Sequence, residues 1–122
     1  MIKVLVVDDS TPVRLGLLTL FRAQRDIEVC GGAADGPEGV RMAQQTSPDV
    51  VVMDLSMPGL DGFEATRQIV RTSPRTRVVV LTGWSRSMAE RAAFLAGADQ
   101  FVLKGDPPDS LLAAVRAGAP TA

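Results

Sequence analysis

Five short runs of Val, Ile and Leu recur along the chain, and this recurrence constrains the fold more than any other feature. The runs are Ile2 to Val7, Ile27 to Cys30, Val50 to Met53, Val78 to Leu81 and Phe101 to Leu103. They are nearly continuous in apolar residues, with little alternation between apolar and polar positions. This pattern is typical of strands that are buried on both faces of a parallel sheet. Such a sheet needs helices packed on each of its sides.

Segments with helical spacing lie between the runs. The apolar faces of three segments are formed by Val13, Leu17, Leu20 and Phe21; by Met88, Ala92 and Leu95; and by Leu111, Leu112 and Val115. Apolar residues three or four positions apart predict amphipathic helices. Strand and helix therefore alternate along the chain, which predicts an α/β fold with a parallel sheet and right-handed crossovers.

Helix ends and loops are marked by residues with known local preferences. The helix signals are Asp35 with Glu38 as a capping box, Pro12 and Pro107 after residues of capping type, and Gly97 and Gly118 at expected helix ends. The loop before the third helix is expected to be shaped by Met57, Pro58, Gly59 and Gly62. We expect one domain over residues 1–118 and a flexible tail over residues 119–122.

Composition excludes several classes of protein. The 122 residues carry 13 Lys and Arg against 14 Asp and Glu, so this segment has no broad basic field for direct binding of nucleic acid. The single cysteine, Cys30, cannot form an internal disulfide and is interpreted as a small buried strand residue. The apolar run at the N-terminus is too short for a signal peptide or a membrane span, which predicts a cytoplasmic protein without membrane partners.

Reactive side chains stand at the ends of four of the predicted strands. Asp8 and Asp9 follow the first strand, and Asp54 follows the third. Thr82 ends the fourth strand and Lys104 the fifth. Because ligand sites in parallel α/β sheets form outside the carboxyl ends of the strands, these residues are candidates for one site.

Three carboxylates in one crevice repel one another, and each close pair costs roughly 4 kcal/mol at an effective dielectric constant of 20. A cation is therefore expected among them. Oxygen ligands without histidine favour a hard cation, and two or three carboxylates with waters suit Mg²⁺. Lys104 can supply further positive charge beside Asp54. Asp54 is then a candidate nucleophile for aspartyl-phosphate chemistry.

Four motifs, VLVVDDS, VVMDLSMPGLDG, VVVLTG and FVLK, resemble in order and spacing the receiver domains of two-component response regulators. The resemblance covers nearly the whole chain. It implies a flavodoxin-like, doubly wound, three-layer fold with a five-stranded parallel sheet of order 2-1-3-4-5 and five helices. The segment LAGADQFVLKGDPPDSLLAAVRAG is similar to receivers of the LuxR/NarL type, which precede a helix-turn-helix in many regulators.

The resemblance also implies a metal site for Mg²⁺. Asp9 matches the direct metal ligand, and Asp8 matches the acid that acts more often through water. Asp54 matches the phosphoacceptor, which also contacts the metal. Ser56 matches the residue whose backbone carbonyl completes the metal shell.

Switch residues are implied in the same way. Thr82 matches the hydroxyl residue that closes on the phosphoryl group, and Lys104 matches the conserved-type lysine of the site. Phe101 matches the aromatic residue that turns inward with Thr82, and packing would carry its signal because it lacks the hydroxyl of tyrosine. Gly105 stands where many receivers have a proline after a cis peptide, so a trans linkage is expected. Trp84 is expected to be partly exposed beside Thr82.

The implied function is a phosphorylation-dependent signalling switch, which is not a conventional enzyme and performs only self-catalysed phosphoryl transfer and autodephosphorylation. Its implied partner is a sensor histidine kinase or a phosphotransfer protein, and a homodimer is possible. If the natural protein is longer, the missing part is a candidate DNA-binding output domain. If it ends here, a partner protein must carry the output.

Three other functions stay open. A haloacid-dehalogenase-type phosphatase also uses an aspartyl nucleophile, but its Asp-x-Asp pattern after the first strand differs from the order Asp8, Asp9, Ser10 found here. A flavodoxin-type flavin binder needs a phosphate loop rich in Gly, Ser and Thr after the first strand, which is missing. A receiver-like scaffold that works without phosphorylation is disfavoured by the complete acidic set.

Overall fold

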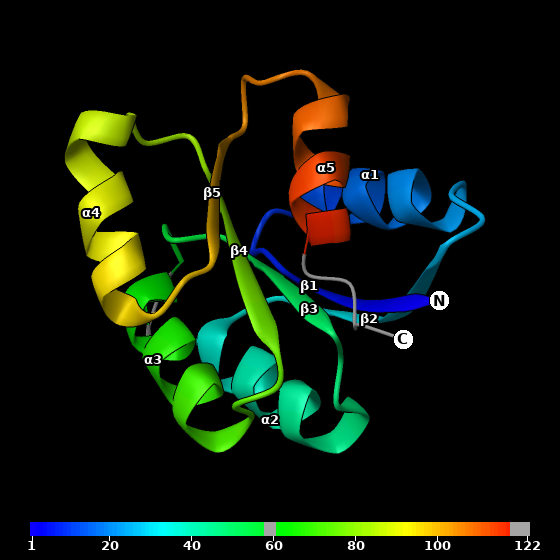
Figure 1. Cartoon of the computed structure of the whole chain (residues 1–122), viewed down its shortest axis with the longest axis horizontal. Helices are drawn as coiled ribbons and strands as arrows, with labels where there is room; N and C mark the ends of the chain where they lie inside the picture. Colours follow the sequence, from blue (N-terminus) through cyan, green and yellow to red (C-terminus); the bar gives the residue numbers. More distant parts are fainter. Residues whose placement is uncertain (58–60, 118–122) are drawn as a thin grey trace.

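The computed structural model describes residues 1–57 and 61–117, in which five strands alternate with five helices (Figure 1). The elements are β1 (Ile2–Val7), α1 (Thr11–Arg22), β2 (Ile27–Ala33), α2 (Gly36–Thr46), β3 (Val50–Met53), α3 (Gly62–Thr72), β4 (Arg77–Thr82), α4 (Arg86–Ala96), β5 (Gln100–Leu103) and α5 (Pro108–Ala117). All neighbouring strands are parallel and their order is β2-β1-β3-β4-β5. The predicted α/β class, parallel sheet and strand order are confirmed.

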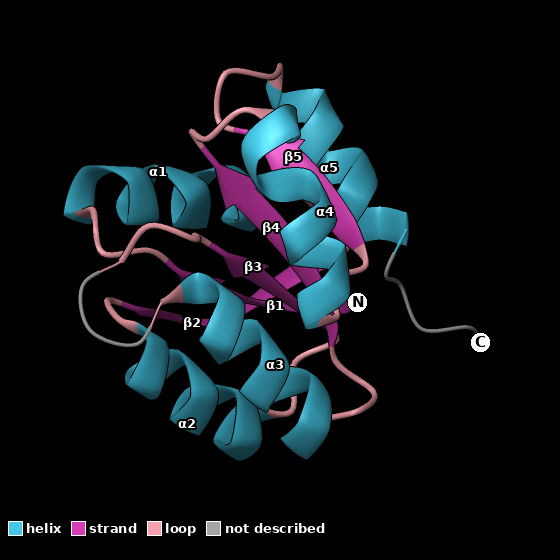
Figure 2. Ribbon diagram, turned by 90° about the vertical axis from the view of Figure 1, so that its left-hand side faces the viewer, coloured by secondary structure: helices cyan, strands magenta, loops and turns pink. Residues whose placement is uncertain are grey.

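The sheet forms the middle of three layers. Helices α1 and α5 cover one face, and α2, α3 and α4 cover the other (Figure 2). In β1 the side chains of Val4 and Val6 join the core under α1 and α5, while Leu5 and Val7 join the core on the opposite face. Both faces of each central strand are therefore buried, which explains the nearly continuous apolar runs.

Strand β2 extends further than its apolar run predicts. The expected strand ended at Cys30, whereas the observed strand continues through Gly31 and Gly32 to Ala33. Glycine is a poor strand former, so the sequence hid this extension. The register against β1 shifts from Val29 to Gly31, which leaves Cys30 as the extra residue of a bulge. Cys30 is half-buried rather than buried.

The apolar face proposed for α4 does not pack on the sheet. Met88 and Leu95 are 73% and 76% exposed, whereas Ala89, Ala93 and Ala96 are buried. Both sets have helical spacing, and Ala89 and Ala96 each come one residue after Met88 and Leu95, so the buried face is turned by one residue from the predicted face. The small alanine side chains allow α4 to lie close to the sheet, so close packing outweighs the larger apolar area of Met and Leu. The expected faces of α1 and α5 do contribute to the core, through residues such as Phe21 and Leu112.

Within the described residues, the helix ends follow the sequence signals at Pro12, Asp35 and Gly97, whereas α5 begins at Pro108, one residue after the predicted Pro107. The Asp35 carboxylate accepts from the Glu38 amide at 2.8 Å, as in a capping box. The Glu38 carboxylate accepts at 3.4 Å from the amide of Ala34, one residue before the N-cap residue Asp35. Gly97 ends α4 with a left-handed φ of 111°. Pro58, Gly59, Gly118 and the tail 119–122 lie outside the described residues. Within those residues, no helix has the length and apolar character needed to cross a bilayer.

Candidate functional site

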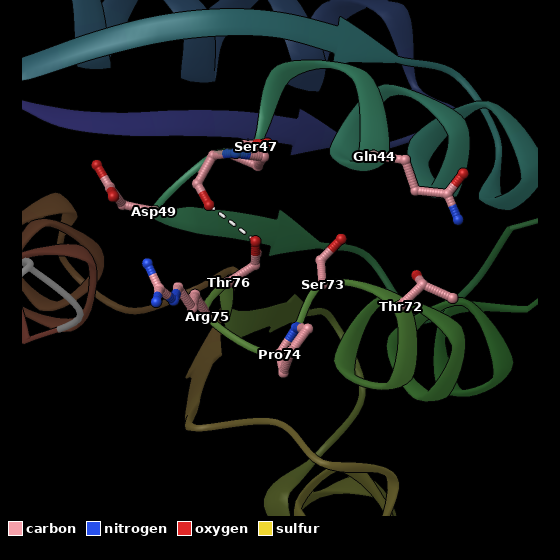
Figure 3. Close-up of a pocket in the computed structure, with 9 residues that line it drawn as sticks. Gln44, Ser47, Asp49, Thr72, Ser73, Pro74, Arg75 and Thr76 are labelled. Atoms are coloured by element: carbon pink, nitrogen blue, oxygen red, sulfur yellow. Dashed lines mark hydrogen bonds between the residues drawn. The ribbon is translucent and has the colours of Figure 1, made fainter.

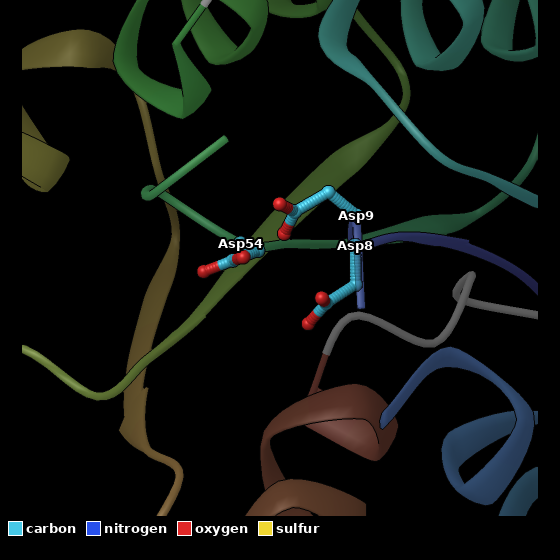
Figure 4. Close-up of side chains that lie close together, drawn as sticks. All are labelled: Asp8, Asp9 and Asp54. Carbon is cyan, nitrogen blue, oxygen red and sulfur yellow. The ribbon is translucent and has the colours of Figure 1, made fainter. Parts of the chain in front are cut away.

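Three carboxylates meet where β1 and β3 end. Asp8 and Asp54 are only 1% and 4% exposed, while Asp9 is exposed. One carboxylate oxygen from each of the three lies within 4.8 Å of the others, and Figure 4 shows the side chains projecting into the same space. β1 and β3 are hydrogen-bonded neighbours in the sheet, so the strand ends bring these residues together. The predicted acidic cluster is therefore present.

Lys104 bridges the two buried acids. Its Nζ lies 3.1 Å from Oδ2 of Asp8 and 3.6 Å from Oδ1 of Asp54. Its backbone amide donates to the carbonyl of Thr82 at 2.8 Å, which ties the end of β5 to the end of β4. The peptide bond from Lys104 to Gly105 is trans, as the sequence predicts. The Lys104 ammonium therefore lies beside Asp54, where the sequence predicts it.

Backbone hydrogen bonds fix Asp54 in this position. Its amide donates to the carbonyl of Val7 at 3.0 Å, and its Oδ1 accepts from the amide of Ser56 at 3.3 Å. Burial raises the pKa of the Asp54 carboxyl above its ordinary value, and the nearby Asp8 raises it further, while Lys104 acts in the opposite direction. Ionised Asp54 is therefore a charge that favours an additional cation.

The same charge predicts the effect of Asp54→Asn on stability. Without divalent metal, the variant should be more stable at pH 7 by on the order of 1 kcal/mol, because the substitution removes a buried negative charge that Asp8 repels. The ion pair between Lys104 and Asp8 remains in the variant. Since folding raises the pKa of Asp54, this advantage should shrink as the pH falls through the raised value. Urea unfolding of both proteins checks this, with Asp109→Asn as the control for net charge. A less stable Asp54→Asn protein would contradict the account.

Thr82 is fully buried at the end of β4. Its Oγ1 accepts from the backbone amide of Trp84 at 3.1 Å, which leaves the hydroxyl hydrogen available for donation. The Trp84 side chain is 38% exposed, as expected, and its ring centre lies 6.0 Å from that of Phe63 on α3. The fluorescence of Trp84 should therefore respond to changes between the C-terminal end of β4 and the start of α3.

Phe101 is buried in β5 and belongs to the core that α2, α3 and α4 cover. The Arg86 guanidinium lies over its ring at 5.5 Å from the ring centre. Arg86 also pairs with Glu90 at 2.5 Å and approaches Asp106 at 3.8 Å. The aromatic ring is thus held inward beneath the first turn of α4. Ser56, the remaining predicted residue, is exposed two positions after Asp54.

One contact at the site was not predicted from the sequence. Arg14 on α1 donates from Nη1 to the backbone carbonyl of Asp8 at 2.8 Å. No sequence motif links Arg14 to the acids. Its position one turn after the N-cap Ser10 does place it at the N-terminal end of α1, which is the end next to Asp8 and Asp9.

A large surface pocket, called the hollow below, lies away from the acidic cluster. It has a volume of about 580 Å³ and is bordered by the segments after α2 and α3, including Ser47, Ser73 and Arg75 (Figure 3). Asp49, which precedes β3, also borders it, whereas Asp54 follows β3. Thr76 donates to the Pro48 carbonyl at 2.8 Å across this region. The hollow therefore lies at the opposite edge of the sheet from the acidic cluster.

Comparison with protein families gives an independent assignment. The family model described as the response regulator receiver domain matches residues 4–116. The chain belongs to the response regulator receiver family. Receivers are the signalling modules of two-component systems, and the resemblance seen in the four sequence motifs is confirmed.

Individual relatives refine the assignment of this receiver. It is 45% identical over 117 residues to the transcriptional regulatory protein LiaR of Bacillus subtilis, covering 96% of this chain and 56% of LiaR. A solved LuxR-family response regulator from Aurantimonas superimposes with a TM-score of 0.91 at 37% identity, over 96% of this chain and 84% of that one. These similarities confirm the LuxR/NarL-type assignment. The receiver spans about half the length of the curated relatives that it matches.

A more distant solved structure shares the fold. It is the CheX–CheY complex with BeF3 and Mg²⁺ from Borrelia burgdorferi, in which the matching chain is 25% identical to this receiver. The TM-score is 0.87, over 95% of this chain and 87% of that one. The receiver fold is therefore retained at low sequence identity.

Proposed function

We propose that this receiver accepts a phosphoryl group on Asp54 from a sensor histidine kinase or a phosphotransfer protein. The observation that carries the proposal is the bridge from Lys104 to the two buried acids, beside the exposed carboxylate of Asp9. This arrangement combines an anchored nucleophile with a fixed positive charge. Both are needed where a negatively charged group is transferred to a carboxylate.

The transfer can be written with the residues of the chain. A carboxylate oxygen of Asp54 bonds to phosphorus as the bond between phosphorus and the donor imidazole breaks, and the electron pair leaves with the imidazole. Lys104 then exchanges its contact with Asp54 for one with a phosphoryl oxygen. Hydrolysis of the same acyl phosphate by water would restore the carboxylate. Phosphoryl transfer and autodephosphorylation are the only reactions we propose.

The donor set at the site fits Mg²⁺. Carboxylate oxygens of three acids converge there, and a hard divalent cation prefers such ligands. Asp9 and Asp54 would hold the ion directly, Asp8 through water, and Ser56 through its backbone carbonyl. When bound, the ion supplies positive charge that offsets the charge on the transferred group. The presence of Mg²⁺ and BeF3 in the related CheX–CheY complex supports this choice of metal.

Thr82 and Phe101 would convert phosphorylation into a change of surface. The Thr82 hydroxyl, free to donate, would move toward the phosphoryl group, and the ends of β4 and α4 would repack around Phe101. A shift from about 1:99 to 99:1 between two states needs roughly 5.5 kcal/mol. A few charge-assisted hydrogen bonds can supply this preference.

Thr82→Ala tests the link between phosphate and surface. We expect Asp54 to remain phosphorylated, while the ratio of switched to unswitched protein falls by about tenfold or more, because a charge-assisted hydrogen bond contributes about 1.5 to 3 kcal/mol. The measurement is the change in Trp84 fluorescence on adding beryllofluoride with Mg²⁺. Thr72→Ala, at an exposed position of α3, is the matched control. An unchanged response in Thr82→Ala would disprove the link.

The relatives support a proposal for the wider role of the protein. LiaR is a transcriptional regulatory protein, and this receiver covers only 56% of its length. We therefore propose that residues 1–118 form the receiver unit of a cytoplasmic regulator. Any DNA binding would reside in a further domain, and phosphorylation would control a homodimer or another protein partner.

Intact-mass measurement tests the proposed phosphorylation. The receiver is incubated with acetyl phosphate in Mg²⁺ and, separately, in EDTA. We expect a phosphoryl adduct that requires Mg²⁺, is lost in Asp54→Asn and persists in Asp49→Asn, which removes an acid at the opposite end of β3. If no adduct forms and beryllofluoride gives no response, the phosphorylation-independent scaffold is the better account.

A further inference from the structure

We propose that Arg14 is a positioning residue for the metal site, which sets the direction of the Asp9 carboxylate by fixing the peptide unit between Asp8 and Asp9. The proposal rests on the proposed function, because it concerns Mg²⁺ binding at the acidic pair. Arg14 does not belong to the acidic cluster, and its role would be exerted through the backbone.

The hydrogen bonds around Asp8 carry the first part of the argument. The Arg14 guanidinium donates from Nη1 to the backbone carbonyl of Asp8 at 2.8 Å. That carbonyl belongs to the peptide unit that joins Asp8 to Asp9. The amide of Asp8 donates to the carbonyl of Ala33 at 3.0 Å, and its Oδ1 accepts from the amide of Ser10 at 2.9 Å. Arg14 therefore completes the anchoring of Asp8 on the side that faces Asp9.

Asp9 depends on this anchoring more than its neighbours do. Asp8 and Asp54 are buried and are held by Lys104, whereas Asp9 is exposed. Among the hydrogen bonds between described residues, none involves the Asp9 side chain. The direction in which this carboxylate leaves the chain is consequently set by the backbone at Asp8 and Asp9. A ligand whose orientation is fixed before binding loses less entropy when a metal binds.

The packing of the Arg14 side chain is an independent observation. A Cβ atom placed on Gly32 would lie 3.2 Å from Cδ and 3.3 Å from Cγ of Arg14. The missing side chain on β2 thus makes room for the aliphatic stem of Arg14 to cross the strand and reach the Asp8 carbonyl. The Nη2 atom is further oriented by the Thr11 hydroxyl at 3.4 Å. The guanidinium is therefore aimed at a backbone atom by contacts from both α1 and β2.

Arg14 is not part of an ion pair within the described residues. The salt bridges found there within 4.0 Å involve other cations, among them Lys104 with Asp8. If Arg14 acted only through its charge, its removal would relieve repulsion with Mg²⁺ and tighten metal binding. If it positions Asp9, its removal must weaken metal binding. The two roles therefore predict opposite signs.

The test measures Mg²⁺ affinity by titration calorimetry and by Trp84 fluorescence, together with urea unfolding in EDTA. Arg14→Met keeps an apolar stem without donors and should weaken Mg²⁺ binding by about tenfold, the usual effect of losing a residue that orients a metal ligand. Arg14→Lys keeps a donor and should remain within about threefold of the parent. Arg22→Met, at an exposed position at the end of α1, should bind Mg²⁺ like the parent.

Gly32→Val provides a second route that retains the charge. Its side chain should displace the Arg14 stem and weaken Mg²⁺ binding, although Arg14 itself is still present. Equal or tighter Mg²⁺ binding by Arg14→Met would overturn the proposal, as would lower stability with unchanged affinity. A parent protein that does not bind Mg²⁺ would overturn both this proposal and the proposed metal site. A parent that binds Mg²⁺ and is matched by Arg14→Met would overturn the positioning role alone.

Discussion

Replacing Lys104 by methionine should slow phosphoryl transfer to Asp54 by about a hundredfold or more. Its ammonium lies 3.1 Å from Asp8 and 3.6 Å from Asp54, where negative charge accumulates as the phosphoryl group arrives. Loss of one preorganised donor at such a position typically costs two to three orders of magnitude in rate. Methionine has a similar length and no charge, so the change removes mainly the electrostatic contribution. The rate is measured by intact mass during incubation with acetyl phosphate and Mg²⁺.

The sequence offers a matched control for this variant. The protein has only two lysines, and Lys3 lies at the start of β1, at the other end of the sheet from Lys104. Lys3→Met changes the net charge equally and should phosphorylate at the parental rate. A Lys104→Met protein that remains folded and reacts within about threefold of Lys3→Met would show that this ammonium is not required.

Replacing Gly62 by alanine should destabilise the protein by about 3 kcal/mol and disturb the phosphoacceptor. Gly62 begins α3, and a Cβ atom placed on it would lie 2.1 Å from the carbonyl oxygen of Asp54 and 2.5 Å from Cα of Leu55. Both neighbours are backbone atoms, so no side chain can move aside. Either α3 or the segment that carries Asp54 must shift. Urea unfolding measures the loss, and the rate of adduct formation should fall with it.

The same substitution at Gly16 should have the opposite sign. Gly16 lies within α1, and no heavy atom beyond its own surroundings lies within 4 Å of an added Cβ. Alanine there should raise the free energy of unfolding by up to about 1 kcal/mol, because glycine is the weaker helix former. If Gly62→Ala proved as stable as Gly16→Ala, the close approach of α3 to Asp54 would be wrong.

The site could be predicted because it depends on strand ends. Once apolar runs identify parallel strands, their carboxyl ends must share one edge of the sheet, so the residues that follow them meet there. Asp8, Asp54 and Lys104 meet in this way, and their spacing along the chain needed no knowledge of side-chain packing. The strand order and the family followed from the resemblance of four motifs.

Packing between distant segments accounts for what the sequence did not reveal. The apolar face of α4 was misjudged because Met88 and Leu95 have the same spacing as the alanines that actually pack on the sheet. The extension of β2 was hidden by glycines, which serve the fold here by letting the Arg14 stem cross at Gly32. The approach of Gly62 to Asp54 likewise depends on where α3 docks. The periodicity of apolar residues identifies helices and strands. It does not show which of two similar helix faces packs on the sheet, and it does not reveal contacts between residues far apart in the sequence.

The central claim is that Asp54 is the phosphoacceptor, and locating the phosphoryl group tests it most directly. The receiver is phosphorylated with acetyl phosphate and Mg²⁺ and then reduced with borohydride, which converts an aspartyl phosphate to homoserine, before digestion and peptide mass spectrometry. The account predicts conversion at Asp54 alone, in the segment that follows β3. Conversion at Asp8, Asp9 or another acid with Asp54 unmodified would contradict it.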